Sequence, residues 1–160
     1  MALEIERKFL VKDDSWRPQA IAVKRISQIY LTASGTTVRV RIQDDEAFLA
    51  IKGKAENFSR LEFEYPIPMA DAVAMFDSLA LDCPVEKRRY IVPAGDGLFW
   101  EIDEYEKANA PLFTAEIELP SEDTAFVRPS WLGEEISADS RYTNRALSRK
   151  PYSCWSEAEK

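Results

Sequence analysis

Charged residues of one sign recur two positions apart along this chain, and this pattern constrains the fold more than any other sequence feature. Six such pairs lie within segments where apolar residues alternate with the charges: Glu4/Glu6, Arg39/Arg41, Glu62/Glu64, Lys87/Arg89, Glu101/Asp103 and Glu116/Glu118. Residues two apart in a strand share one face of the sheet at roughly 7 Å spacing. Like charges at that spacing repel each other unless groups of opposite sign lie between them. The strands that carry these pairs therefore need compensating charges on the same face.

Hydrophobic residues alternate with these charges and predict a mainly β (α+β) chain. The alternation predicts eight strands, over residues 3–10, 25–32, 37–42, 48–52, 60–67, 86–92, 98–105 and 114–119. Helical spacing predicts a helix over residues 69–81 and another over 141–150, which Pro151 ends. A short helix is expected to begin at Ser121 and to end before Pro129. Residues 13–24 form either a loop or a short helix.

Two arrangements of the eight strands fit this pattern. An antiparallel sheet of eight strands can close into a barrel wide enough for one small ligand. Its apolar face would lie outward under flanking helices, and its charged face would line a tunnel. Burying so many ionisable groups is costly unless water, ligand or metal compensates them. The alternative is an open antiparallel sheet whose charged face is solvated, although six sorted pairs favour the charged interior.

The two kinds of pair predict two kinds of ligand. Basic pairs that face one another favour an anion with several negative charges. Acidic pairs favour a hard divalent cation with oxygen ligands, such as Mg²⁺ or Mn²⁺. A tunnel that carries both kinds would bind an anion and a cation together.

Missing residues and motifs exclude several classes of enzyme. The 160 residues contain no histidine, which excludes Ser-His-Asp and Cys-His nucleophiles and histidine zinc sites. Cys83 and Cys154 form no C-x-x-C motif, so we expect two reduced thiols and no zinc site or disulfide. The sequence also has neither a P-loop nor a G-x-G-x-x-G motif.

Length and charge set the remaining expectations. The length suits a single domain over residues 1–160. The net charge of −7 predicts no general affinity for nucleic acid or for anionic membranes. The N-terminus is charged from residue 4 and no apolar run is long enough to cross a membrane. We therefore expect a cytoplasmic location.

Motifs along nearly the whole chain resemble those of the CYTH superfamily, also called triphosphate tunnel metalloenzymes. The N-terminal Glu4-x-Glu6-x-Lys8 resembles the family signature, although alone it is a weak signal. Further matches follow in the family's order: Gln28-Ile29-Tyr30-Leu31, Val38-Arg39-Val40-Arg41, Ile51-Lys52-Gly53, Arg60-Leu61-Glu62-Phe63-Glu64, Glu86-Lys87-Arg88-Arg89-Tyr90, Trp100-Glu101-Ile102-Asp103, Ala115-Glu116-Ile117-Glu118-Leu119 and Trp131 to Ile136 with Arg141-Tyr142-Thr143-Asn144. Residues 106–112 depart from the family's glycine-rich stretch, and Ile29 replaces its usual glycine.

The resemblance implies an eight-stranded antiparallel tunnel that binds a triphosphate with one or two divalent cations, Mg²⁺ or Mn²⁺. The compact chain is most similar to bacterial inorganic triphosphatases. The implied reaction is in-line attack of a metal-activated water on a terminal phosphoryl group, which converts tripolyphosphate to pyrophosphate and phosphate. The substrate is then a small molecule that contains a triphosphate, and the resemblance leaves open whether the chain is a homodimer.

Roles follow from the motifs that match the family. The cations that would bind phosphate oxygens are Lys8, Arg39, Arg41, Lys52, Lys87 and Arg89. The carboxylates that would hold the metal are Glu4, Glu6, Glu116 and Glu118, and those that would complete its surroundings or orient the lysines are Glu62, Glu64, Glu101 and Asp103. Lys52 and Tyr30 are the candidate catalytic residues. Tyr30 would orient or deprotonate the water, or it is a strand aromatic that only packs.

Other functions remain open from the sequence. A class IV-type adenylyl cyclase would need a nucleoside pocket, for which the sequence shows no feature. A thiamine triphosphatase would need aromatic residues at a tunnel mouth, and Trp16 and Trp155 are the candidates. A non-catalytic module that binds polyphosphate or nucleotide would carry the same charges.

Overall fold

A computed structural model describes residues 3–160 of the chain. Met1 and Ala2, which the predicted domain includes, lie outside the described residues. The strands are β1 (Leu3–Val11), β2 (Ala22–Tyr30), β3 (Thr37–Gln43), β4 (Glu46–Lys52), β5 (Ser59–Pro66), β6 (Val85–Gly95), β7 (Leu98–Tyr105), β8 (Phe113–Glu118) and β9 (Leu132–Glu135). The helices are α1 (Met69–Ser78) and α2 (Asn144–Arg149), with short 3-10 helices η1 (Arg17–Gln19), η2 (Lys107–Asn109), η3 (Ser140–Tyr142) and η4 (Tyr152–Cys154). No helix in residues 3–160 is long and apolar enough to cross a membrane.

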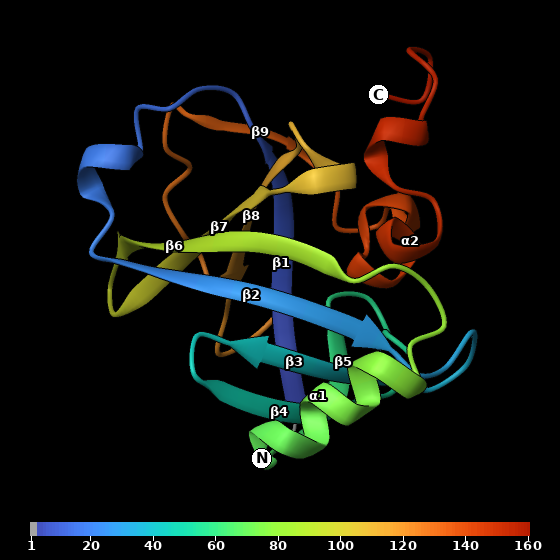
Figure 1. The fold of residues 1–160 in the computed structure, drawn as a ribbon. Helices are drawn as coiled ribbons and strands as arrows, with labels where there is room; N and C mark the ends of the chain where they lie inside the picture. The colour runs from blue at the N-terminus through green and yellow to red at the C-terminus, as the bar shows by residue number, and fades with distance from the viewer. Residues whose placement is uncertain (1–2) are drawn as a thin grey trace.

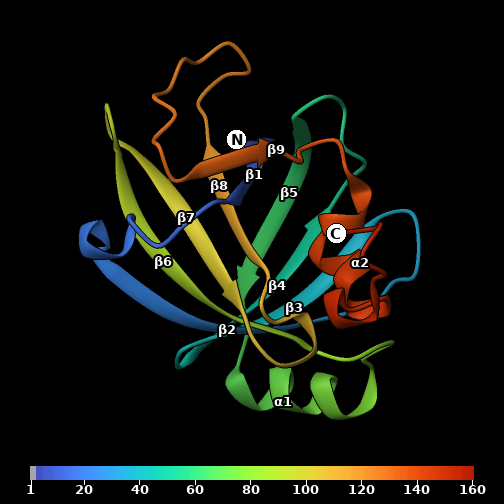
Figure 2. The ribbon, with the colours of Figure 1, turned by 90° about the horizontal axis from the view of Figure 1, so that it is seen from above.

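The strands close into the antiparallel barrel that the alternation predicts. Their order is β5-β4-β3-β2-β6-β7-β8-β1, and β1 pairs with β5 to complete the circle. Figure 2 shows these strands around a common axis, with α1 outside them. The closed eight-stranded barrel is therefore confirmed, and the open sheet is wrong.

Strand β1 holds the barrel together because it changes partner along its length. Residues 3–5 pair with β5, residues 6–10 pair with β8, and the C-terminal end pairs with β9. The short strand β9 was not predicted, because four residues that include a glycine and two glutamates carry no strand signal. It lengthens the sheet beyond the barrel at the edge of β1.

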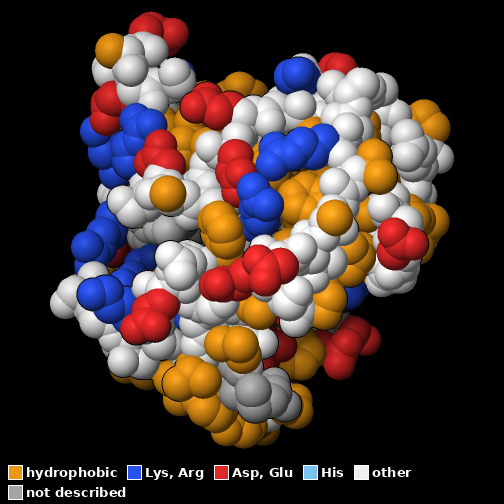
Figure 3. Space-filling view, turned by 180° about the vertical axis from the view of Figure 1, so that it is seen from behind, with side chains coloured by type: hydrophobic (Ala, Val, Ile, Leu, Met, Phe, Trp, Pro, Cys, Tyr) orange, Lys and Arg blue, Asp and Glu red, His pale blue; other side chains and the backbone are white. Residues whose placement is uncertain are grey.

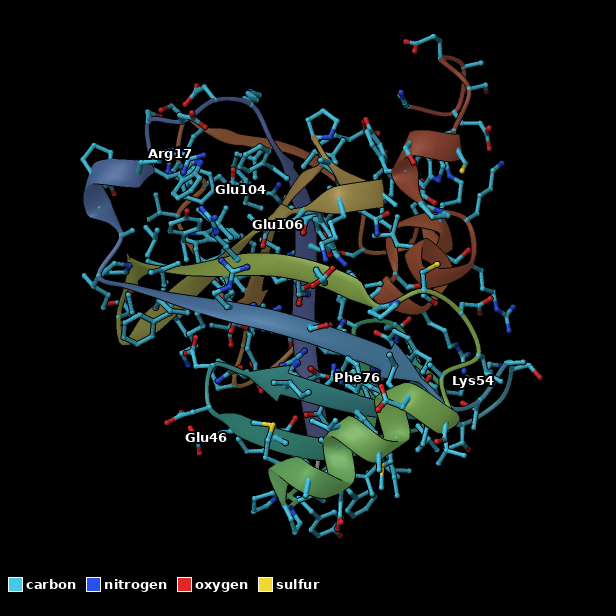
Figure 4. The ribbon with its side chains drawn as sticks, in the orientation of Figure 1. Arg17, Glu46, Lys54, Phe76, Glu104 and Glu106 are labelled. Carbon is cyan, nitrogen blue, oxygen red and sulfur yellow. The ribbon has the colours of Figure 1, made fainter. Side chains whose placement is uncertain are left out.

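The apolar core lies outside the barrel, in three clusters on the outer face of the sheet. Helix α1 covers one cluster and packs Ala72 and Phe76 against Ile29, Val40 and Ala47; Figures 1 and 4 show this helix across β3 and β4, with Phe76 on it. The C-terminal segment covers a second cluster with Tyr142, Leu147 and Trp155. Both are flanking helical segments, as expected.

Irregular chain, rather than a helix, covers the third and largest cluster. Trp16 and Trp131 come from two loops and are buried beside Phe9 and Trp100 of the sheet. Trp100 meets Trp131 edge to face with ring centroids 5.4 Å apart. Large aromatic rings bury enough area for a loop to cover a sheet without a helix. The expectation that helices cover all of the apolar face is therefore wrong here.

Two helix predictions need correction. No helix forms after Ser121; a single turn closes there, where the Ser121 amide donates to Thr124 Oγ1 at 3.2 Å, and the chain then extends to place Phe126 against Phe9. The 141–150 helix is divided at Thr143, whose extended backbone caps α2 through Oγ1. Residues 13–24, predicted as a loop or a short helix, contain η1 and the first three residues of β2. The helix predicted over 69–81 is confirmed but ends at Ser78.

Part of the outer face remains uncovered. Leu61, Phe63 and Tyr65 project outward from β5 and are 43–55% exposed. Hydrophobic side chains gather in the lower part of the molecule seen from behind, and side chains of both charges lie side by side above them (Figure 3).

Gly133 allows β9 to approach β1 closely, and its substitution tests this contact. A Cβ at this position would lie 2.8 Å from the Leu10 carbonyl oxygen, which is backbone and cannot rotate away. We expect Gly133→Ala to lower the free energy of unfolding by about 1–3 kcal/mol. At Gly53 the nearest atom to a new Cβ is 3.7 Å away, so Gly53→Ala should change stability by less than about 0.5 kcal/mol. Equal urea midpoints for the two variants would contradict this assignment.

Candidate active site

A cavity of about 230 Å³ lies inside the barrel, and polar side chains line all of it. Its charged lining residues in the described part of the chain are seven cations and seven carboxylates: Lys8, Arg39, Arg41, Lys52, Arg60, Arg89, Arg145, and Glu4, Glu6, Glu62, Glu64, Glu101, Glu116, Glu118. Tyr30, Thr37 and Asn144 complete the lining. The formal charge of this wall is close to zero, so an incoming polyanion would have to bring cations with it.

The cavity brings together all but two of the predicted site residues. Lys87 and Asp103 lie behind its wall, and their side chains have no exposed surface. Four lining residues were not predicted as site residues: Thr37, Arg60, Asn144 and Arg145. Strand alternation could have found Thr37 and Arg60, because each lies two positions before a predicted site residue on its strand. Asn144 and Arg145 come from α2 and carry no such signal.

Ion pairs between strands hold most of the cavity cations. Lys52 Nζ lies 2.8 Å from Glu62 and 3.1 Å from Glu4. Arg39 pairs with Glu64 at 3.2 Å. Burial favours the neutral form of Glu62, but the charge of Lys52 outweighs it and lowers the Glu62 pKa. The pair with Lys52 therefore favours the ionised form of Glu62 in a partly desolvated space.

One end of the cavity is built around Asp103. Arg89 donates to both Asp103 oxygens at 2.8 and 2.9 Å, and Lys87 Nζ lies 2.7 Å from the same carboxylate. Burial would raise the Asp103 pKa, but Arg89 and Lys87 together lower it. Burial also lowers the pKa of Lys87 to about 7. The charge of Asp103 raises this pKa and the charge of Arg89 lowers it, but burial has the largest effect. Burial therefore disfavours the charged form of Lys87 even though this lysine lies beside Asp103.

The C-terminal segment orients the two lysines at this end. Lys8 Nζ donates to the Tyr142 carbonyl oxygen at 2.9 Å and lies 3.3 Å from Glu116. Lys87 Nζ donates to Asn144 Oδ1 at 3.0 Å. The break in the chain at Thr143 places both acceptors, because η3 ends at Tyr142 and α2 begins at Asn144.

Tyr30 is held by a hydrogen-bond relay. Gln28 is fully buried and its Nε2 donates to Tyr30 Oη at 3.1 Å, while Gln28 Oε1 accepts from Arg41 Nε at 3.0 Å. Because Tyr30 Oη accepts from the amide, its own proton is free to point into the cavity that it lines. Tyr30 is therefore placed to donate a hydrogen bond into the cavity.

Glu6 and Glu118 lie opposite each other on β1 and β8, and neither forms an ion pair within residues 3–160. Burial and the charges of Glu116 and Glu4 raise the pKa of Glu6 well above its usual value. Burial, Glu4 and Glu101 likewise raise the pKa of Glu118. Crowded carboxylate oxygens without a cation fit the ligand set that Mg²⁺ and Mn²⁺ prefer. Within residues 3–160, however, no three such groups already converge as a metal site.

The raised pKa values of Glu6 and Glu118 predict how ligand-free stability depends on pH. Each carboxyl holds its proton to a higher pH in the folded chain than in the unfolded chain, so stability should fall as pH rises from 4.5, the ordinary glutamate pKa, toward neutrality. Lys87 acts in the opposite sense, but only from about pH 7 upward. Thermal melts in chelator should show this fall, and Glu118→Gln should reduce it. Glu46→Gln, on the β3–β4 hairpin (Figure 4), should leave the dependence unchanged, and a rise over this range would contradict the assignment.

Arg41 has no carboxylate partner in residues 3–160, and this predicts a gain in stability on its replacement. Burial and the charges of Arg39 and Arg89 lower the pKa of Arg41 to about 10. In Arg41→Gln the new Nε2 takes the place of the arginine Nε and still reaches Gln28. We expect the ligand-free variant to gain about 1 kcal/mol, or roughly 2–4 °C in Tm. Arg88→Gln, on the outer face of β6, is the control, and a lower Tm for Arg41→Gln would contradict the argument.

The chain is similar to several known proteins in sequence and in structure. The family model for the CYTH domain matches residues 2–148. A protein named inorganic triphosphatase from Acetivibrio thermocellus is 38% identical over 157 residues, which are 98% of this chain and 100% of that protein. Another of that name from Nitrosomonas europaea is 34% identical over 148 residues, 90% and 95% of the two chains. The crystal structure of the inorganic triphosphatase NE1496 superposes with a TM-score of 0.66 at 34% identity, over 91% of this chain and 97% of that chain.

Proposed function

The chain belongs to the CYTH domain family, and on that premise we propose that it hydrolyses inorganic tripolyphosphate to pyrophosphate and orthophosphate. The observation that carries the proposal is the cavity wall, which consists of charged and polar side chains alone. A ring such as a nucleobase would find little apolar surface there, because Tyr30 is the one aromatic residue among the lining residues described. The volume of about 230 Å³ is also below the roughly 300–1,000 Å³ of pockets that hold drug-sized ligands. Both features favour a bare chain of phosphates.

The cations on the cavity wall would bind the phosphate oxygens. Arg39, Arg41 and Arg89 suit bidentate contacts, and Lys8 and Lys52 suit point contacts. Each cation except Arg41 already neighbours a carboxylate, so its position is fixed before substrate binds. Preorganised charge of this kind stabilises the negative charge that spreads over the transferring oxygens. Lys87 would act from behind the wall through its charge.

A divalent cation would be held by Glu6 and Glu118 together with Glu4 and Glu116. Such an ion would neutralise phosphate charge and make a water molecule more acidic. Glu62, Glu64, Glu101 and Asp103 would keep the neighbouring lysines and arginines in place, as their ion pairs indicate. Tyr30 would donate its proton to a phosphate oxygen or orient the attacking water. Its accepted hydrogen bond from Gln28 supports a donor role rather than the role of a base.

A second class of substrate is favoured by one further observation. A groove lined by Ile21, Leu98, Phe99, Leu119 and Pro120 shares Glu101 and Glu118 with the tunnel cavity. An organic group attached to the triphosphate could lie in this apolar groove outside the tunnel. Thiamine triphosphate and ATP are therefore the alternatives to test, the latter by hydrolysis or by cyclisation.

The substrate assignment is tested with a panel of tripolyphosphate, pyrophosphate, ATP and thiamine triphosphate. Phosphate release and cyclic nucleotide formation are both measured, with Mg²⁺, with Mn²⁺ and in excess chelator. We expect tripolyphosphate to react fastest, no cyclic nucleotide to form, and all turnover to stop on chelation and return with added metal. Cyclic nucleotide as the main product would contradict the hydrolase, and full turnover in chelator would contradict the metal.

A matched pair of lysines tests whether the cavity is the site. Lys52 is 6% exposed inside the cavity, whereas Lys54, two residues later, is exposed away from it (Figure 4). Lys52→Ala should lower kcat/KM for tripolyphosphate by roughly 10- to 150-fold, the range expected when a hydrogen bond to a charged group is lost. Lys54→Ala should keep the wild-type value. Equal effects of the two variants would place the reaction elsewhere.

A further inference from the structure

Asn144 stands between the buried ammonium of Lys87 and the tunnel cavity. Lys87 does not reach the cavity, since its side chain has no exposed surface. Asn144, the first residue of α2, accepts a hydrogen bond from Lys87 and itself lines the cavity. At this place, the group that a ligand would meet is therefore the amide of Asn144 and not the lysine.

Two donors fix the orientation of that amide. Asn144 Oδ1 accepts from Lys87 Nζ at 3.0 Å and from Tyr105 Oη at 3.0 Å. An amide oxygen has two lone pairs, so both are in use. A rotated amide would bring its NH₂ group against the Lys87 amine and the Tyr105 hydroxyl, both of which donate to the amide oxygen in this structure. The Nδ2 group is therefore left for other partners, and it has no hydrogen-bond partner within residues 3–160.

The surroundings of Asn144 favour an anionic ligand. Tyr142, two residues earlier, holds Lys8 through its carbonyl oxygen, and Asp103 joins Lys87 to Arg89. A positive charge that hydrogen-bonds the amide oxygen also polarises the amide, which strengthens its N–H groups as donors. The amide thus offers a directed donor without adding charge, close to Lys87 and Arg89, which share Asp103.

From these contacts we infer that Asn144 is a substrate-binding residue whose Nδ2 donates a hydrogen bond to a phosphate oxygen of the triphosphate. The inference rests on the proposed function and adds to it a neutral donor that comes from α2 rather than from the barrel. Lys87 and Tyr105 are then positioning residues, because they hold the amide and do not touch the substrate.

The decisive variant is Asn144→Asp. An aspartate still accepts from Lys87 and Tyr105, so the fold and the Tm should be retained or improved. Its second oxygen, however, replaces the N–H donor and repels phosphate. We expect KM for tripolyphosphate to rise at least about tenfold, as for the loss of a hydrogen bond to a charged group. Calorimetric binding of tripolyphosphate should weaken by a similar factor.

Two further variants separate this role from general effects. Gln19→Glu makes the same amide-to-carboxylate change at an exposed residue outside the cavity and should keep the wild-type KM and Tm. Asn144→Ala removes both the acceptor and the donor, so it should lower the Tm and raise KM. If Asn144→Asp does not fold, Asn144→Ala decides, and a KM within twofold of wild type overturns the inference.

The outcomes distinguish this inference from the proposed function. Turnover by the wild type with an unchanged KM in Asn144→Asp overturns the role of Asn144 and leaves the proposed function in place. A wild type that neither hydrolyses nor binds tripolyphosphate overturns both. Turnover by the wild type, with a raised KM and an unchanged Tm in Asn144→Asp, supports both.

Discussion

The structure depends on ion pairs that join different strands on the inside of the barrel. A barrel with charged residues inside would be unstable if each charge stood alone, because desolvation of an isolated ion costs several kcal/mol. Here Glu62, Glu64 and Asp103 each meet a cation from another strand at 2.7–3.2 Å. The apolar faces can then lie outward and form the core beneath α1, the loops and the C-terminal segment. The interior remains available for a ligand because it does not have to supply the hydrophobic stabilisation.

Strand alternation accounts for most of what could be predicted from the sequence. Residues two apart in a strand share one face of the sheet. The pairs Glu4/Glu6 and Arg39/Arg41 therefore both face the interior once the sheet closes. The same rule identified most of the side chains that line the cavity. It was not extended to Thr37 and Arg60, and it cannot reach Asn144 and Arg145 of α2. Closure itself does not follow from alternation, since an open sheet shows the same period. The sorted charges, and the resemblance they carried, favoured the barrel.

The remaining features depend on tertiary contacts that a local pattern does not contain. Strand β9 exists because Gly133 fits against the Leu10 carbonyl. The helix expected after Ser121 is absent because Phe126 is buried against the outer core instead. Lys87 shares a face of β6 with Arg89, but it does not line the cavity, because Asn144 lies between it and the cavity. In each case a partner far away in the sequence decides the outcome.

The closing seam of the barrel links its shape to its electrostatics. Only residues 3–5 of β1 pair with β5 there, and from inside the seam is bridged by Glu4, which meets both Lys52 of β4 and Arg60 of β5. An anion that draws these two cations to itself loosens the bridge, and a cation that draws Glu4 does the same from the other side. Filling the tunnel and opening its wall are thus coupled equilibria, so the free energy of one is transmitted to the other. The side chains that close the barrel at this seam are thus the same ones that line its binding cavity.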